Sequence, residues 1–414
     1  MSAPWIEAPA FAPADFGRLR RAMIFEYCKW DPQTQDRATL AATPLVLRRE
    51  AWAELSEAAE LLFCETILAE QELLGRPDLQ RRLGLSSWLR RALAHGPPLG
   101  SGPRVMRFDF HPTHEGWALS EVNADVPGGY VEASGFSALA AEVCPRTESP
   151  GDPAEMLARA LRRRLRGDAT VALVHATAYS DDAQVVRFLA AKLRTLGLGT
   201  VELGPAQLSW RDHGARVLGD VRLGDVAAIF RFFPAEWLRN LPRATALPYF
   251  ANRWLPQTNP ASALLAQSKR MPLVWDEMRT PLPTWRRLLP TTAHPRRLAP
   301  ADDGWVLKPA LGRVGEGVGI AGVTPPALLR RIRLAARLRP DAWIAQRRFH
   351  SLPWTTSTGI LFPSVGVFVV DGKSAGAYGR AAARPLIDRD AADVAVLVEA
   401  RFEGGVRAAA VGAR

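Results

Sequence analysis

The sequence has few cysteines and no long apolar run. Its three cysteines, Cys28, Cys64 and Cys144, are odd in number, far apart and without a CxxC pair. This pattern excludes a disulfide framework and a thiolate zinc site, and it fits a reducing cytoplasm. No apolar stretch approaches the roughly 20 residues of a membrane-spanning helix. The N-terminus has no positively charged segment before an apolar one, so we expect no signal peptide and a cytoplasmic protein without membrane contact.

Lysine is scarce, although the chain is strongly basic. The net charge is +11, but 48 of the 53 basic residues are arginines. They lie in helix-like runs such as "ARALRRRLRG" without interleaved aromatic residues, so we expect solvated helix faces and no nucleic-acid partner. The same field favours an anionic small molecule such as a nucleotide. The five lysines, Lys29, Lys192, Lys269, Lys308 and Lys373, are therefore the exceptions that need a reason.

The length and the pattern of segments predict an α/β protein of several regions. At 414 residues the chain exceeds one compact domain. Apolar residues at alternating steps of three and four predict a helix over 46–75, and a second helix is predicted over 78–96. Between 152 and 233, helical and buried-strand patterns alternate as in a small Rossmann-like unit. We divide the chain into 1–135, mostly helical but ending in two strands; 136–245, Rossmann-like; 246–340, with a glycine-rich loop at 311–319; and 341–414, rich in strands.

Two neighbouring predicted strands, 103–110 and 117–123, carry charged residues where the sequence otherwise looks buried. The two-residue period of a strand places Arg107 and Asp109 on one face, and aromatic and aliphatic residues on the other. In the second strand Leu119, Glu121 and Asn123 share a face. The segment between the strands, "HPTHEG", is typical of a loop.

A hairpin centred near Glu115 would place Asp109 opposite Glu121, and Arg107 opposite Asn123. Two facing carboxylates repel each other unless a cation lies between them. Oxygen ligands from Asp, Glu and Asn suit Mg²⁺, with Mn²⁺ as a second possibility. The alternatives are a solvated hairpin and an ion pair between Arg107 and Asp109 without a metal.

Lys308 stands in the apolar strand pattern "GWVLKPA", where a lysine is unfavourable unless its ammonium meets an anion. Four glycines follow within 312–319 and allow a loop whose N–H groups close over phosphates. The loop matches neither a Walker A motif nor a dinucleotide fingerprint. Further candidates are Gln346, Arg380 and Lys269, and Lys269 is predicted to lie on a helix. The alternatives are a surface position for Arg380 and a side chain that extends into solvent for Lys269.

The order of these motifs resembles the synthetase half of glutathionylspermidine synthase and its relatives, a circularly permuted ATP-grasp family. The resemblance rests on "RFD" at 107–109, "EVN" at 121–123, "RFFPAEWL" at 231–238 and "SKRMPLVW" at 268–275. It continues with "LKPALGRVGEG" at 307–317, "AQRRFHSLP" at 345–353 and "YGR" at 378–380. The matches span most of the chain in the order of the family.

The resemblance implies an ATP-grasp fold in permuted order, with a small Rossmann-like (pre-ATP-grasp) domain. The first region would carry the metal-binding strands, 246–340 would be the ATP-binding lobe with 311–319 as its lid, and 341–414 would complete the core. The residues that would contact ATP are Lys269, Lys308, Arg313, Gly315, Gly317 and Gln346. Those that would hold Mg²⁺ are Asp109, Glu121 and Asn123. Arg107 and Arg380 would stabilise the transferring phosphoryl group and the acyl-phosphate.

The implied activity is ATP-dependent formation of an amide from a carboxylate and an amine. The acid would be peptide-like or amino-acid-like, and the acceptor an amine or polyamine. After "EVNAD" stand Pro127, Gly128 and Gly129, where the family tends to carry small hydroxyl residues, so both substrates stay open, as does the oligomeric state. The alternative is a catalytically inactive nucleotide-binding protein that acts through its basic surface.

Overall fold

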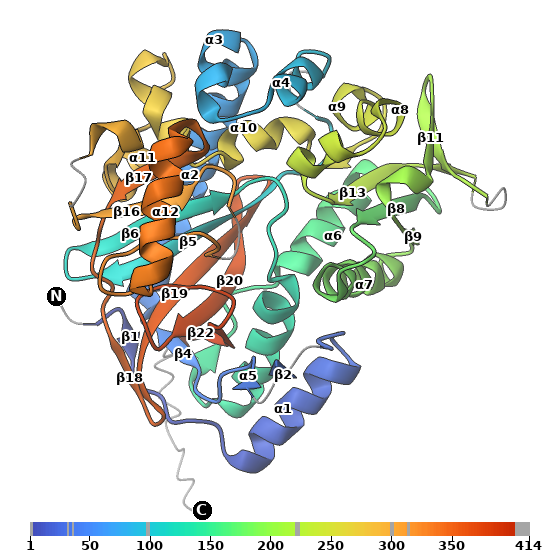
Figure 1. Ribbon diagram of the computed structural model, residues 1–414. Helices are drawn as coiled ribbons and strands as arrows, with labels where there is room; N and C mark the ends of the chain where they lie inside the picture. The colour runs from blue at the N-terminus through green and yellow to red at the C-terminus, as the bar shows by residue number, and fades with distance from the viewer. Residues whose placement is uncertain are drawn as a thin grey trace, which may run out of the picture.

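The centre of the molecule is an antiparallel sheet, shown in Figure 1. The computed structural model describes residues 3–30, 33–34, 37–96, 100–219, 224–298, 302–312 and 315–401. Within these residues the sheet has the order β21-β20-β19-β5-β6, and β18 pairs with β19. The strands are β5 (Val105–Thr113), β6 (Gly116–Asn123), β18 (Trp354–Thr356), β19 (Gly359–Val370), β20 (Lys373–Ala382) and β21 (Ala392–Val394).

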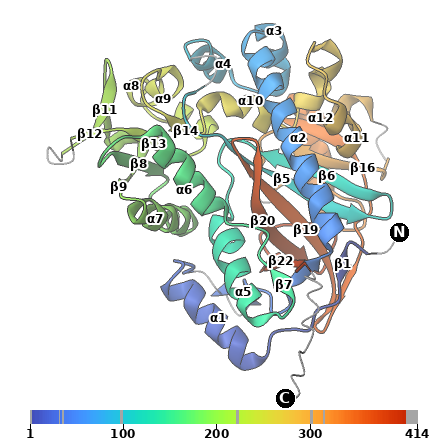
Figure 2. The same cartoon turned by 180° about the vertical axis from the view of Figure 1, so that it is seen from behind.

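A hydrophobic core lies between one face of this sheet and helix α2 (Arg49–Leu74), which crosses the sheet in Figure 2. Phe108 and Phe110 of β5 are fully buried there, together with Leu55 and Leu62 of α2. The predicted helical stripe over 46–75 is confirmed. Because side chains alternate along a strand, burying the aromatic face leaves Arg107 and Asp109 on the other face.

The predicted hairpin is confirmed with its register. Asp109 pairs with Glu121, and Arg107 pairs with Asn123. The turn is shorter than predicted, because strand pairing continues to residues 113 and 116. A tight turn of two residues thus fixes which side chains face each other.

A β-bulge interrupts the hairpin beside its acidic pair. Asp109 pairs with Glu121 and Phe110 with Leu119, so Ser120 is an extra residue without a partner. The bulge shifts the alternation by one position, and Leu119 turns into the core, where it is fully buried. The prediction that Leu119 shares a face with Glu121 was therefore wrong.

The predicted Rossmann-like unit is present. Its parallel sheet has the order β14-β13-β8-β9, and α6 and α7 accompany it. The elements are α6 (Pro153–Arg164), β8 (Thr170–His175), α7 (Ser180–Thr195), β9 (Gly199–Leu203), β13 (Ala228–Phe232) and β14 (Gln257–Thr258). An antiparallel sheet that the sequence did not predict joins β10 (Leu208–Arg211), β11 (Gly214–Val217) and β12 (Asp225–Val226).

A buried ion pair joins this unit to the central hairpin. Arg231 of β13 donates to Asp125, two residues beyond the end of β6, and both side chains are fully buried. Arg231 also donates to the carbonyl oxygen of Asn259, at 2.9 Å. The side chain of Asn259 donates in turn to the carbonyl oxygen of Val105, at 2.8 Å. These bonds hold the end of the hairpin against the parallel sheet.

A three-stranded sheet carries two of the candidate residues. It consists of β15 (Thr292–Ala293), β17 (Trp343–Arg347) and β16 (Trp305–Pro309), and helix α12 (Pro326–Leu338) packs on it. Lys308 lies on β16 and Gln346 on β17, as the sequence predicted.

Lys269 does not lie on a helix, so that prediction was wrong. It stands in a turn between α10 (Leu264–Gln267) and the 3₁₀ turn Met271–Glu277. Its N–H donates to the carbonyl oxygen of Ala310, at 2.9 Å, instead of to its own helix. Pro272 has no N–H to continue a helix. The turn therefore brings Lys269 beside the end of β16.

The N-terminal part is less helical than predicted. The single helix expected over 78–96 is divided into α3 (Pro77–Gln80), a 3₁₀ turn and α4 (Ser87–Leu93). Gly84, with φ of +76°, ends the first part, and the Ser86 side chain caps α4. A sheet of β1 (Trp5–Ile6), β4 (Leu45–Leu47), β22 (Val396–Glu399) and β7 (Thr147–Glu148) joins both ends of the described chain.

The remaining elements are short, apart from α1. They are α1 (Pro13–Phe25), β2 (Gln33–Thr34), β3 (Arg37–Ala38), α5 (Ser137–Val143), α8 (Arg243–Ala246), α9 (Pro248–Ala251) and α11 (Pro283–Leu288). None of the helices in the described part of the chain combines the length and the apolar character needed to span a bilayer.

Candidate active site

A cavity of about 1290 Å³ lies over the polar face of the central sheet. The central sheet, β16, β17 and the Rossmann-like unit all contribute to its walls. It exceeds the roughly 300–1,000 Å³ of a typical small-molecule pocket, so more than one ligand fits inside. The sequence-predicted residues that line it are Arg107, Asp109, Glu121, Asn123, Lys269, Lys308, Gly315, Gln346 and Arg380.

Two predicted residues are not placed on the cavity wall. Gly317 does not line it; a Cβ there would lie 2.9 Å from Cγ of Pro309, so this glycine lets the loop pack on β16. Arg313 lies outside the described residues.

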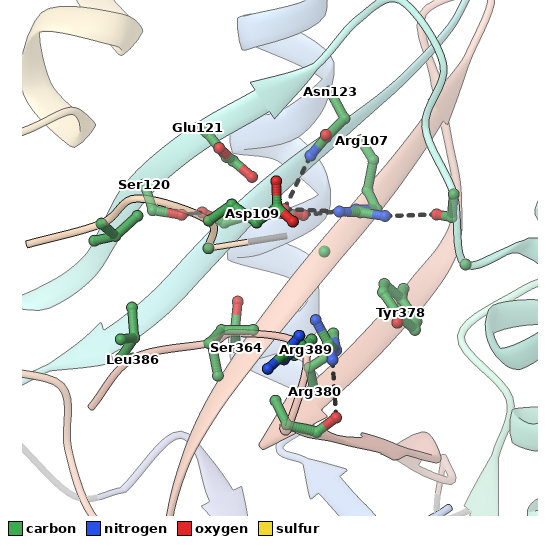
Figure 3. Close-up of a pocket in the computed structure, with 18 of the residues that line it drawn as sticks. Arg107, Asp109, Ser120, Glu121, Asn123, Ser364, Tyr378, Arg380, Leu386 and Arg389 are labelled. Carbon is green, nitrogen blue, oxygen red and sulfur yellow. Dashed lines mark hydrogen bonds and ion pairs between the residues drawn. The ribbon is translucent and has the colours of Figure 1, made fainter. Parts of the chain in front are cut away.

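Arg107 and Asp109 form a two-point ion pair at the centre of the cavity (Figure 3). Arg107 donates from Nε to Oδ1, at 2.7 Å, and from Nη2 to Oδ2, at 2.9 Å. Its third nitrogen donates to the carbonyl oxygen of Gly128, and its guanidinium lies 5.0 Å from the ring centre of Tyr378. Burial lowers the pKa of Arg107, but the Asp109 carboxylate more than offsets this, so the guanidinium stays charged. This is the ion pair that the sequence left open as an alternative to a metal.

Glu121 has a cation of its own. Its Oε2 lies 2.8 Å from Nζ of Lys269. Burial alone would raise the pKa of Glu121, but Lys269 and its neighbours lower it to about 2. Asp109 and Glu121 therefore do not need a metal ion to reduce their repulsion, because Arg107 and Lys269 neutralise them. Asn123 adds a hydrogen bond from Nδ2 to Oδ2 of Asp109, at 3.0 Å.

Lys308 and Lys269 reach the same part of the cavity from different elements. Lys308 donates to Oε1 of Gln346, at 2.7 Å, and to the carbonyl oxygen of Ser120 in the bulge, at 3.2 Å. Lys269 donates to the carbonyl oxygen of Gly312, at 2.8 Å, and so holds the start of the glycine-rich loop. Burial lowers the pKa of Lys308 to about 8. Two ammonium groups beside a glycine-rich loop suit a phosphate chain.

Gln267 ties the Lys269 turn to the end of β6. Its Oε1 accepts hydrogen bonds from the N–H groups of Ala124 and Asp125, at 2.8 and 3.0 Å. The position of Lys269 is thereby coupled to that of the acidic hairpin. This role could not be predicted from the sequence, because a single glutamine in an apolar run belongs to no motif.

A second charged network lies beyond Tyr378. Lys29 donates to Glu132, at 2.6 Å, and to Asp393, at 3.0 Å, while the hydroxyl of Tyr378 donates to Asp393, at 2.7 Å. Arg380 donates to the carbonyl oxygen of Ala391, at 2.8 Å, and its Nε lies 3.7 Å from Asp393. The scarcity of lysine marked Lys29 as unusual, but no motif pointed to its carboxylate partners.

Gly366 on β19 pairs with Asp109 and leaves room for the Arg107–Asp109 ion pair. A Cβ at this position would lie 2.6 Å from Oδ1 of Asp109 and 2.8 Å from Cδ of Arg107. The strand therefore needs a glycine where the ion pair crosses it.

Three of the predicted residues carry oxygen atoms of the kind that Mg²⁺ prefers. Asp109, Glu121 and Asn123 supply oxygen atoms on one face of a hairpin, which is the donor set that Mg²⁺ accepts while it keeps water and phosphate ligands. Across the described residues, no group of three or more His, Cys, Asp or Glu side chains is gathered as for a metal held by protein alone.

Comparison with known proteins places this geometry in a family. The family model described as "Glutathionylspermidine synthase preATP-grasp" matches residues 29–399, which is most of the chain. The chain belongs to this family. The predicted resemblance to glutathionylspermidine synthase is thereby confirmed, as is the α/β fold with a pre-ATP-grasp unit. The permuted order of the ATP-grasp elements stays a prediction.

One solved structure shares the overall fold of this chain. A glutathione synthetase-like effector from Globodera pallida, solved in its apo form, has a TM-score of 0.66 at 12% identity; the match covers 94% of this chain and 99% of the other. A protein named provisionally as a gamma-glutamylcysteine synthetase, from Methylobacillus flagellatus, matches with a TM-score of 0.41 at 13% identity, over 77% and 82% of the two chains. The second score is too low to support an argument. No curated protein sequence matches the chain significantly.

Proposed function

We propose that the protein is an ATP-dependent ligase that joins a carboxylate to an amine and releases ADP and phosphate. Family membership supports the reaction class. The observation that carries the proposal is the meeting of Arg107, Asp109, Lys269, Lys308 and Arg380, from distant parts of the chain, in one cavity. The acid is peptide-like or amino-acid-like, and the acceptor is an amine.

The roles follow from position and charge. Lys308, with Gln346 beside it, and Lys269 bind the phosphates of ATP, and the loop at 311–319 covers them as a lid. Asp109, Glu121 and Asn123 hold Mg²⁺, or Mn²⁺ in its place. When bound, the cation neutralises negative charge on the phosphate oxygens.

The chain's own groups then stabilise the charge that develops on the substrates. An oxygen of the acid attacks the γ-phosphorus, ADP leaves, and an acyl-phosphate forms. The amine nitrogen next attacks the acyl carbon, phosphate leaves, and the nitrogen loses a proton. Arg107 and Arg380 face the negative charge in both steps. Closure of the lid keeps water from the acyl-phosphate.

An ADP-release screen over amino acids, short peptides and amines, with Mg²⁺ present, tests the proposal. We expect ADP formation that requires one particular acid and one particular amine together. Steeply salt-sensitive RNA binding without any ADP release would instead support the inactive nucleotide-binding alternative.

A further inference from the structure

Lys29 has a position that the proposed chemistry does not use. It is one of five lysines in the sequence, is 6% exposed and lines the same cavity. Its ammonium lies between two buried carboxylates, 2.6 Å from Glu132 and 3.0 Å from Asp393. Lys29 lies near the beginning of the chain and Asp393 near its end, so the contact joins distant segments. A buried ammonium with two carboxylate partners is costly to desolvate and needs a reason.

This cluster is connected to the proposed reaction centre. Asp393 accepts a hydrogen bond from Tyr378, at 2.7 Å. The ring of Tyr378 lies under the guanidinium of Arg107, and Arg380 stands 3.7 Å from Asp393. Figure 3 shows Arg380, Tyr378 and Arg107 in succession along the cavity. A substrate at the reaction centre can therefore extend toward Lys29.

The charges in this part of the cavity are already balanced. Lys29 and Arg380 supply two positive charges, and Glu132 and Asp393 supply two negative charges. Burial raises the pKa of Glu132, and Lys29 offsets only part of this effect. If Glu132 takes up a proton, the cluster becomes more positive. A second ammonium on an acceptor would find no buried carboxylate left to pair with.

We propose that Lys29 determines acceptor specificity by taking the position that the second ammonium of a diamine would need. This rests on the proposed ligase function and narrows its acceptor. The acceptor is an amine without a second positive charge, such as a monoamine or an amino acid, and not a polyamine. Asp181 and Asp182 also line the cavity, but Asp181 is exposed and Asp182 is only half-buried, so water screens their attraction for a cation.

The first test measures binding and does not depend on turnover. The protein is titrated with 1,3-diaminopropane and with propylamine, and ligand-induced thermal stabilisation is recorded. In Lys29→Met we expect affinity for the diamine to rise at least about tenfold over wild type, and more than for propylamine, because one buried carboxylate loses its cation. Lys29→Arg and the exposed control Lys373→Met should behave as wild type. Equal diamine affinity in wild type and Lys29→Met, or equal gains for both amines, would overturn the proposal.

The second test uses the ADP-release assay. Wild type and Lys373→Met should use an acceptor amine without a second positive charge and should discriminate against spermidine. Lys29→Met should gain turnover with spermidine. Efficient use of spermidine by wild type would overturn the proposal. Absence of ADP release with every acceptor would refute the ligase function, while the binding result would still decide the role of Lys29.

A double variant covers the case in which Lys29→Met does not fold. Lys29→Met with Glu132→Gln removes one positive and one negative charge together, so the buried cluster stays balanced. We expect this variant to fold and to show no gain in diamine affinity. If diamine affinity rises as much in the double variant as in Lys29→Met, the diamine does not bind through the Glu132 carboxylate and the proposal is contradicted.

Discussion

Lys308 is a site residue whose charge changes not far from neutral pH. Its pKa is about 8, because burial disfavours the ammonium more than Glu121 favours it, and Lys269 adds to the effect of burial. A phosphate prefers the protonated form. We expect ATP affinity to be constant below pH 8 and to weaken about tenfold per pH unit above it.

Titrations of ATP binding between pH 6.5 and 9.5 check this expectation. Lys308→Arg should flatten the profile, because a guanidinium stays charged over the whole range. The stability of the folded chain should change in the opposite direction. An unfolded lysine keeps its proton up to a pKa near 10.5, so the Lys308 contribution to stability rises between pH 8 and 10.5. Wild-type affinity that is independent of pH up to 9.5 would contradict the role of Lys308.

Asp109 and Glu121 are expected to be needed for turnover and not for folding. Asp109→Asn and Glu121→Gln keep the shape of the side chain but remove the charge that would hold the cation. We expect each to lower turnover by roughly 1,000-fold or more. Circular dichroism and the melting temperature should show a folded protein. The control is Asp276→Asn, an exposed aspartate paired with Arg286. Wild-type activity in either site variant would refute the metal assignment.

At the scale of single residues, the sequence was most informative where a residue type was out of place. Asp109 in an aromatic strand and Lys308 in an apolar one were found in this way. Gln267 and Glu132 were missed, because their roles depend on contacts between segments far apart in the chain. The cation that neutralises Glu121 was missed for the same reason, since Lys269 comes from another element.

Strand β19 is predicted to support the site through Gly366. In Gly366→Ala the new methyl group would overlap Arg107 and Asp109. We expect turnover to fall by about a hundredfold, because small displacements of reacting groups are costly. The matched control is Gly214→Ala on β11, which does not line the cavity and where a Cβ meets nothing within 4 Å. Kinetic constants for both variants, with melting temperatures, check this; equal activity of the two would contradict the role of β19.

At the scale of elements, periodic patterns predicted well and local exceptions did not. The stripe of α2 and the register of the β5–β6 hairpin followed from spacing alone. The bulge at Ser120 did not, because a single extra residue leaves the pattern of polar and apolar residues almost unchanged. The break at Gly84 comes from its positive φ and from the cap by Ser86, whereas the turn at Lys269 depends on a hydrogen bond to Ala310 in another segment.

The cavity gathers residues from near both ends of the described chain, so a ligand there should stabilise the whole molecule. At 100 times its dissociation constant, Mg–ATP should add about 2.7 kcal/mol to the free energy of unfolding. The melting temperature with and without Mg–ATP measures this. Lys308→Met should show a much smaller shift. No shift in wild type at millimolar Mg–ATP would contradict nucleotide binding.

At the scale of the molecule, the fold class and the family could be predicted from the order of motifs, and both are confirmed. The division into four regions, the permuted order and the absence of a nucleic-acid partner stay predictions. Composition could not reveal that β5 and β6, from the first region, share one sheet with β19 to β21, from the last. That pairing is what brings Arg107 and Arg380 into one cavity.

The central claim is that this cavity couples ATP cleavage to amide formation. The most direct measurement is ADP release by wild type and Asp109→Asn, with acid and amine added singly and together in the presence of Mg²⁺. We expect wild type to release ADP in equal amount to the amide product when acid and amine are both present, and we expect Asp109→Asn to release none. ADP release that is the same without acid or amine, or the same in Asp109→Asn, would contradict it.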